Sequence, residues 1–130
     1  MTLLAEDLAK PMWQCIHFTD SAPLHESLSR LGVQAASVDG SKISSKADLM
    51  SALAAAFEFP GHFGANWDAL DDSLRDLSWL ETGNHELTVE NARALWQSQP
   101  ELAGGLVESW LGAARRWADL GIGFHLVFEW

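Results

Sequence analysis

Residues 59–79 read FPGHFGANWDALDDSLRDLSW, and this stretch decides how the whole chain is interpreted. Asn66 is a good helix N-cap, because its side-chain oxygen can accept a hydrogen bond from a backbone N–H of the first helical turn. At 100° per residue, the apolar side chains of residues 67, 70, 74 and 77 fall within about 80° of one another. The pattern therefore predicts an amphipathic helix over residues 66–77 with one face in a core.

The opposite side of this predicted helix carries Asp68, Asp71, Asp72, Arg75 and Asp76. Asp68 and Asp72 are four residues apart, so their carboxylates project side by side, and like charges at this spacing weaken a helix by a few tenths of a kcal/mol. The helix dipole stabilises Asp68 in the first turn but helps Asp72 little. A basic partner explains this repulsion better than helix stability does.

The loop before the helix presents a histidine, an aromatic ring and two glycines. Glycines allow positive φ angles or a close approach of another backbone. For Phe63 we prefer core packing. His62 is equally compatible with an idle loop residue and with a contact residue.

Charge is unevenly distributed along the chain. Eighteen acidic residues against eight basic ones give a formal net charge of −10 and a sequence pI of about 4.7. Residues 58–90 hold eight of the acids and a single base, Arg75. Such a chain repels phosphate backbones, which argues against direct binding of nucleic acid. The acidic stretch is either a solvated face that aids solubility or a docking surface for a basic partner.

Length and composition predict one soluble domain. A chain of 130 residues can bury a single sizeable core, and the lone cysteine, Cys15, excludes an internal disulfide and fits a reducing compartment. The first residues carry acids where a signal peptide needs a basic flank, and no stretch approaches the ~20 apolar residues of a membrane span. We therefore expect a cytoplasmic protein that does not enter a membrane.

Apolar runs and helix signals alternate along the sequence. Strands are predicted at residues 13–18, 33–38, 86–89 and 122–128. Helices are predicted at residues 23–31, from the Ser45 cap to before Pro60, at 66–77, at 91–97, and from a start at Ser98, Pro100 and Glu101 to before Gly121. Alternation of this kind predicts an α/β fold with a small, mainly parallel sheet covered by helices.

The motif F-P-x-x-F-G-x-N-x-D-A-L-x-D-x-L, from Phe59 to Leu74, resembles the barstar family of ribonuclease inhibitors, whose hallmark is L-P-x-x-Y/F-G-x-N-x-D-A-L-x-D-x-L. The strand that ends at Asp39-Gly40 and the closing helix and strand also follow the barstar order, and the similarity covers about residues 33–128. The resemblance implies a barstar-like three-layer fold. We expect a single domain over residues 1–130, in which residues 1–32 add a strand and a helix to a barstar-like core at residues 33–130.

The resemblance also implies a function. Barstar blocks the active site of a basic ribonuclease with helix carboxylates that take the place of RNA phosphates. By motif position, Asp72 matches the central contact aspartate, Asp68 the second, Asn66 the polar residue before it, and Gly64 a backbone contact. The expected partner is therefore a basic bacterial ribonuclease toxin, for which this chain would be the immunity protein.

This chain departs from the barstar pattern at several contact positions. His62 stands where barstar has a contacting tyrosine, Asp71 where it has a tryptophan, and Asp76 where it has a glycine of the contact loop. Arg116 occupies the position of a contacting glutamate, and Trp79 is a possible aromatic contact. The candidate partner-binding residues are His62, Gly64, Asn66, Asp68, Asp71, Asp72, Asp76 and Trp79.

Two alternatives remain from the sequence. The chain is an immunity protein of barstar fold for a secreted toxin of another class, with Arg116 and His62 in a new surface, or it holds an enzymatic or metal site at Asp68, Asp72 and His62. The second is disfavoured, because an exposed helix face provides no cleft, and the remaining histidines lack metal-binding spacing. We expect no enzyme activity, cofactor or metal. His125, in a buried strand, is interpreted as a hydrogen-bonded core histidine, and the oligomeric state is left open.

Overall fold

The computed structural model describes residues 3–11 and 14–130. Its elements, with η for a 3-10 helix, are η1 (Ala5–Ala9), β1 (Ile16–Thr19), α1 (His25–Arg30), β2 (Val33–Asp39), η2 (Gly40–Lys42), α2 (Lys46–Ala56), α3 (Trp67–Asp76), β3 (Asn84–Glu90), α4 (Ala92–Ser98), α5 (Pro100–Asp119) and β4 (Phe124–Glu129).

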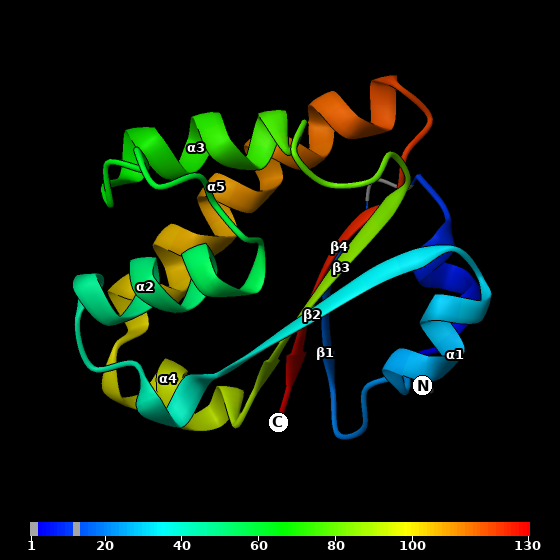
Figure 1. The fold of residues 1–130 in the computed structure, drawn as a ribbon. Helices are drawn as coiled ribbons and strands as arrows, with labels where there is room; N and C mark the ends of the chain where they lie inside the picture. The colour runs from blue at the N-terminus through cyan, green and yellow to red at the C-terminus, as the bar shows by residue number, and fades with distance from the viewer. Residues whose placement is uncertain (1–2, 12–13) are drawn as a thin grey trace.

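The strands form a four-stranded sheet in the order β1-β4-β3-β2 (Figure 1). Every strand pair is parallel, and Leu87 of β3 lies beside Ala36 of β2 and Leu126 of β4. The sequence prediction of an α/β fold with a mainly parallel sheet is confirmed. The predicted N-terminal strand is also present, as the edge strand β1. Its predicted start at Trp13 lies outside the described residues.

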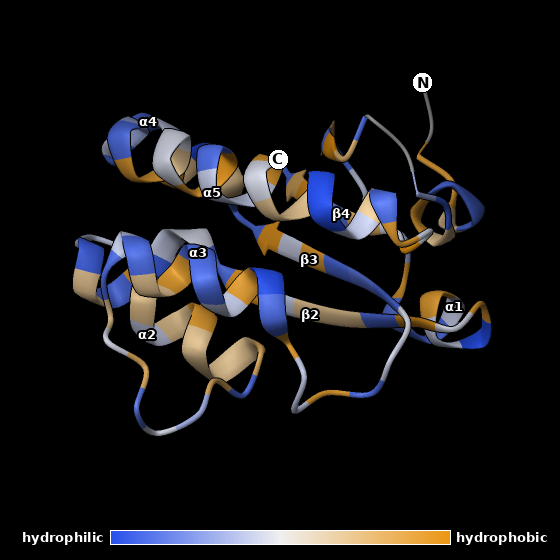
Figure 2. Ribbon diagram, turned by 90° about the horizontal axis from the view of Figure 1, so that it is seen from above, coloured by the Kyte–Doolittle hydropathy of each residue, from blue (hydrophilic) through white to orange (hydrophobic). Residues whose placement is uncertain are grey.

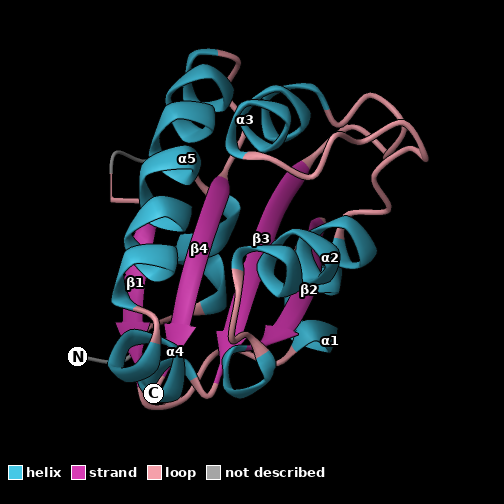
Figure 3. Cartoon of the chain, turned by 90° about the vertical axis from the view of Figure 1, so that its left-hand side faces the viewer, coloured by secondary structure: helices cyan, strands magenta, loops and turns pink. Residues whose placement is uncertain are grey.

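Helices cover the sheet on both faces, which gives three layers (Figures 1 and 3). One face of the sheet packs under α2, α3, α4 and α5 in a large core that includes Leu87, Leu126 and Phe128. The other face is covered by η1 and α1 around a small cluster of Leu8, Leu28, Val33 and Val127. The N-terminal segment thus supplies the third layer as well as an edge strand.

Local signals explain where the helices begin. The Ser45 hydroxyl accepts a hydrogen bond from the Asp48 N–H at 3.1 Å, as the predicted cap requires. The Asp48 carboxylate in turn accepts hydrogen bonds from the backbone N–H and the hydroxyl of Ser44. In a standard capping box it would accept from the N-cap residue itself, which is one residue later. Pro100 occupies the first turn of α5, where its missing N–H costs nothing.

Two sequence predictions are corrected at this level. Ser98 does not start α5: it ends α4, and its hydroxyl donates to the carbonyl of Ala94. Glu86 belongs to the acidic stretch at residues 58–90, yet its side chain is fully buried in the sheet, so it is part neither of a solvated face nor of a docking surface. The reason is that β3, at the centre of the sheet, is covered on both faces.

Hydropathy colouring shows both hydrophilic and hydrophobic residues along α3 (Figure 2). Leu70 and Leu74 are fully buried and Leu77 nearly so, which confirms the core face predicted for this helix. Trp67 is partly buried and packs on the same core. Among the described residues, no helix is long and apolar enough to cross a membrane.

Candidate protein-binding site

The start of α3 is fixed by Asn66. Its side-chain oxygen accepts a hydrogen bond from the Ala69 N–H at 2.8 Å, and its amide group donates to the carbonyl of Gly64 at 3.4 Å. Ala65, between them, adopts a positive φ of 52°. This arrangement ties the exposed Gly64 backbone to the first turn of the helix, so the loop and the helix present one surface.

The inner side of α3 is fixed on α5. Trp67 lies over Gly105, where a Cβ would come within 2.5 Å of its indole, so the close approach requires glycine. At the other end of α3, the Trp117 indole N–H donates to the carbonyl of Leu74 at 2.8 Å, and Arg116 Nε donates to the carbonyl of Arg75 at 3.1 Å. The helix is therefore held at both ends.

The outer side of α3 carries three exposed carboxylates, those of Asp68, Asp72 and Asp76, one turn apart from each other. Across residues 3–11 and 14–130, the ion pairs within 4 Å are Lys10–Asp7 and Arg30–Glu26, so none of the three carboxylates is neutralised by a salt bridge. A partner can thus reach these charges without breaking an existing ion pair.

A pocket of about 230 Å³ lies between this helix face, the preceding loop and Trp79. Its lining consists of Pro60, His62, Phe63, Gly64, Ala69, Asp72, Ser73, Asp76 and Trp79. The Trp79 ring is fixed, because its N–H donates to the carbonyl of Phe57 at 2.8 Å. Phe63 is fixed against Phe59, with ring centroids 4.7 Å apart. Two carboxylates with aromatic walls suit a flat cationic side chain.

The pocket brings together five of the residues that the sequence singled out: His62, Gly64, Asp72, Asp76 and Trp79. Asp68 and Asn66 lie outside it, toward the start of the helix. Asp71 is placed differently. It falls between Trp67 and Arg75, which both contact glycines of α5, and its half-buried carboxylate has one oxygen that is buried without a hydrogen-bond partner. Asp71 therefore faces the α3–α5 contact rather than the pocket.

Three further pocket residues, Pro60, Ala69 and Ser73, were not predicted from the sequence to belong to the site, and Phe63 was assigned only to packing. A signal for the helical ones was present. Residues 69, 72, 73 and 76 follow the i, i+3, i+4, i+7 spacing that places side chains on one stripe of a helix. That stripe faces the loop and Trp79.

Arg116 was the residue that conflicted most with a basic partner. The structure gives it a role within the molecule, because its guanidinium caps a carbonyl at the end of α3. A cation at a helix C-terminus interacts favourably with the dipole. Its presence is thus explained without a contact to another protein.

No group of three or more metal-ligating side chains occurs among the described residues. What the structure does place together is an acidic helix, a fixed loop and an aromatic-walled pocket on a parallel α/β sheet. A family model described as Barstar (barnase inhibitor) matches residues 33–129, which span β2 to the end of β4 and include the whole site. The chain is therefore a member of the barstar family.

Proposed function

We propose that this protein inhibits a basic bacterial ribonuclease toxin by covering its active site with the outer face of α3 and the adjacent pocket. The observation that carries the proposal is the row of three exposed carboxylates without salt bridges on α3, beside an acidic pocket, in a member of a family of ribonuclease inhibitors. Family members of this kind act as inhibitors and not as enzymes.

Mimicry of phosphates supplies the mechanism. A ribonuclease active site holds arginine, lysine and histidine side chains for the RNA backbone, and carboxylates on a rigid helix satisfy the same groups. Asp72 is the central contact, because it both lies on the exposed face and lines the pocket. Asp68 and Asp76, one turn to either side, extend the negative surface by about 6 Å in each direction along the helix axis.

Charge also governs the speed of association. A net charge of −10 attracts a basic partner over distances of a Debye length, so we expect fast association that slows as salt is added. No bond of either protein is broken, and inhibition is stoichiometric.

The test is a titration of the protein into a barnase-type ribonuclease while RNA cleavage is followed at low and moderate salt. Asp72→Asn is compared with a matched control, Asp20→Asn, which removes an exposed aspartate from the β1–α1 connection. We expect stoichiometric inhibition by the wild type and the control, and its loss in Asp72→Asn.

Equal inhibition by Asp72→Asn would refute the proposed role of α3. If the wild type itself does not inhibit, the proposal narrows to the second candidate, an immunity protein of the same fold for a toxin of another class. The departure from the barstar pattern at His62, which lines the pocket, favours that candidate. Identification of the protein that co-purifies with the chain then decides its target.

A further inference from the structure

The N-terminal residues 3–10, here called the strap, lie across the face of the sheet opposite to the large helical core (Figure 1). Leu8 anchors the strap in the small cluster with Leu28, Val33 and Val127. Gly123 allows the backbone of the strap to come close, since a Cβ there would lie 3.0 Å from the carbonyl oxygen of Lys10 and 3.2 Å from that of Leu8. The strap is outside the segment that matches the barstar family.

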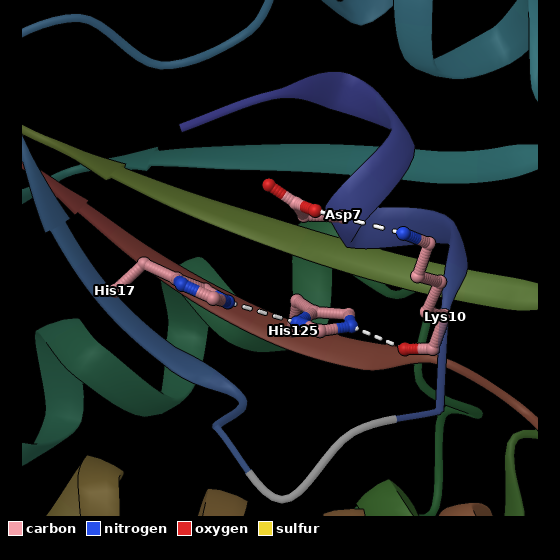
Figure 4. A network of polar contacts seen from close by, with 4 residues as sticks. All are labelled: Asp7, Lys10, His17 and His125. Carbon is pink, nitrogen blue, oxygen red and sulfur yellow. Dashed lines mark hydrogen bonds and ion pairs between the residues drawn. The ribbon is translucent and has the colours of Figure 1, made fainter. Parts of the chain in front are cut away.

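A short hydrogen-bond chain joins the strap to the sheet (Figure 4). His125 Nε2 lies 2.7 Å from the carbonyl oxygen of Lys10. Because a carbonyl only accepts, His125 donates through Nε2, which leaves the Nδ1 of the neutral ring as an acceptor. His17 Nε2 lies 2.9 Å from that Nδ1 and donates to it. Two imidazolium rings would leave no acceptor nitrogen for this bond, so the geometry excludes a charge on both rings when the strap is closed.

The groups beneath the strap are buried. His125 and its register partner Glu86 on β3 are fully inaccessible, and the Glu86 carboxylate has the Thr88 hydroxyl as a donor at 2.8 Å. The titratable and charged groups around His125 are His17 of β1, Asp7 and Lys10 of the strap, Glu86 of β3 and Glu129 of β4. The helix α1 contributes the apolar Leu28 to this layer.

Burial opposes charge on each of these groups. It lowers the pKa of His17 to about 4, with the neighbouring His125 as a second cause, and lowers the pKa of His125 from 6.5 despite the bond to Lys10. It raises the pKa of Glu86 from 4.5 to about 7. Exposure to water returns each pKa toward its usual value. Between about pH 6.5 and 4.5, opening therefore takes up protons at both histidines, at most one each, and releases one from Glu86.

We propose that the strap is an acid-released cover, which detaches from the sheet on acidification while the helical core behind the sheet stays folded. The strap separates first because its described anchors are few: the buried Leu8, the partly buried Leu3, Ala5 and Ala9, and the hydrogen bond from His125 to Lys10. The large core on the other face includes residues of α2, α3, α4 and α5. The net uptake is at most one proton, which raises the opening constant by up to about tenfold per pH unit. The inference does not depend on the proposed inhibitory function.

The experiment is hydrogen exchange of the full chain, followed by mass spectrometry and corrected for the intrinsic exchange rate, between pH 6.5 and 4.5. In the wild type we expect the opening constant of the strap to rise by up to about tenfold per pH unit as the pH falls, while α5 stays protected. His125→Gln keeps a donor toward the Lys10 carbonyl and cannot be protonated, so opening becomes nearly independent of pH. Glu86→Gln removes the proton that Glu86 releases on opening, so the opening constant rises more steeply than in the wild type, by up to about 100-fold per pH unit.

The matched control is His85→Gln, which removes a buried histidine from the helical face of the sheet, where it packs beside Trp117 and Phe124. Its strap should open as in the wild type. The proposal is overturned if strap protection in the wild type is constant over this pH range, if α5 loses protection together with the strap, or if His125→Gln opens with the wild-type slope. Should His125→Gln fail to fold, the comparison of Glu86→Gln with the wild type decides, because an unchanged slope there also refutes the proposal.

Discussion

Two regions of this molecule hold ionisable groups in opposite ways. On the outer face of α3, Asp68, Asp72 and Asp76 are exposed and have no salt bridge within the described residues. On the strap side of the sheet, Glu86 and His125 are fully buried, and each has a hydrogen-bond partner inside the protein. The ionisable groups of the first region are in contact with water, whereas those of the second region are buried away from water.

The difference separates recognition from stability. Exposed charges contribute little to folding, because water solvates them about as well as a surface partner does. They are available to another protein, whose arginines and lysines can then be paired in a drier environment. Buried groups contribute to the pH dependence of folding, because their charged forms are excluded from the native state. Substitutions should therefore affect binding in one region and stability in the other.

The largest effect that separates the regions is expected for Asp72→Lys. A cation in the pocket would face the cationic groups of the proposed partner, and such a contact costs several kcal/mol, so the affinity for the proposed ribonuclease target should fall at least about 1,000-fold. The free energy of unfolding should change by less than about 0.5 kcal/mol, since the residue is exposed and a lysine relieves the repulsion with Asp68. Calorimetric titration and urea denaturation measure the two quantities. A loss of stability as large as the loss of binding would contradict the separation.

Glu86→Gln, on the strap side of the sheet, should change stability and leave binding to the partner unchanged. In the folded protein the pKa of Glu86 is about 7, above its usual value of 4.5. The contribution of this side chain to the free energy of unfolding is therefore intact below pH 4.5 and is lost as the pH rises through 7. The amide is not ionised at any pH, so the variant should gain up to about 3 kcal/mol over the wild type between pH 4.5 and pH 8. Urea denaturation at the two pH values provides the measurement. A stability difference that does not vary with pH would show that Glu86 titrates normally in the folded protein.

Two adjacent glycines of α5 test how the core positions the acidic face. Gly105→Ala places a Cβ within 2.5 Å of the Trp67 indole, so the helix must shift, at a cost of about 1–3 kcal/mol. Gly104→Ala meets no atom within 4 Å and should stabilise α5 by up to about 1 kcal/mol. Thermal unfolding distinguishes the two variants. Equal effects would mean that the contact between α3 and α5 does not hold Trp67 in place.

Much of the acidic face was predictable from the sequence. The spacing of Leu70, Leu74 and Leu77 fixes which side of the helix is buried, and Asn66 fixes where it begins, so the exposure of Asp68 and Asp72 follows. These are local properties of one helix. The α/β class was predictable for the same reason, because the apolar pattern and the capping residues that indicate each strand and helix lie within that segment.

The pocket and the strap were not predictable, because both depend on contacts between distant residues. Trp79 becomes a pocket wall through a hydrogen bond to Phe57, 22 positions away. The prediction that His125 is a hydrogen-bonded core histidine is confirmed, but its partners, His17 and Lys10, lie 108 and 115 positions away. The burial of Glu86 depends on a strap whose sequence shows no sign of covering a sheet.

The smallest expected effect concerns Asp68, which lies on the acidic face but outside the pocket. If the pocket supplies short-range contacts and the rest of the face supplies attraction, Asp68→Asn should slow association a few-fold at low salt and leave the dissociation rate nearly unchanged. The effect should fade near 1 M salt, where the Debye length is about 3 Å. Stopped-flow binding at several salt concentrations, with Asp20→Asn as the control for net charge, measures this. A change confined to dissociation would place Asp68 in direct contact with the partner and would extend the contact region by one helical turn beyond the pocket.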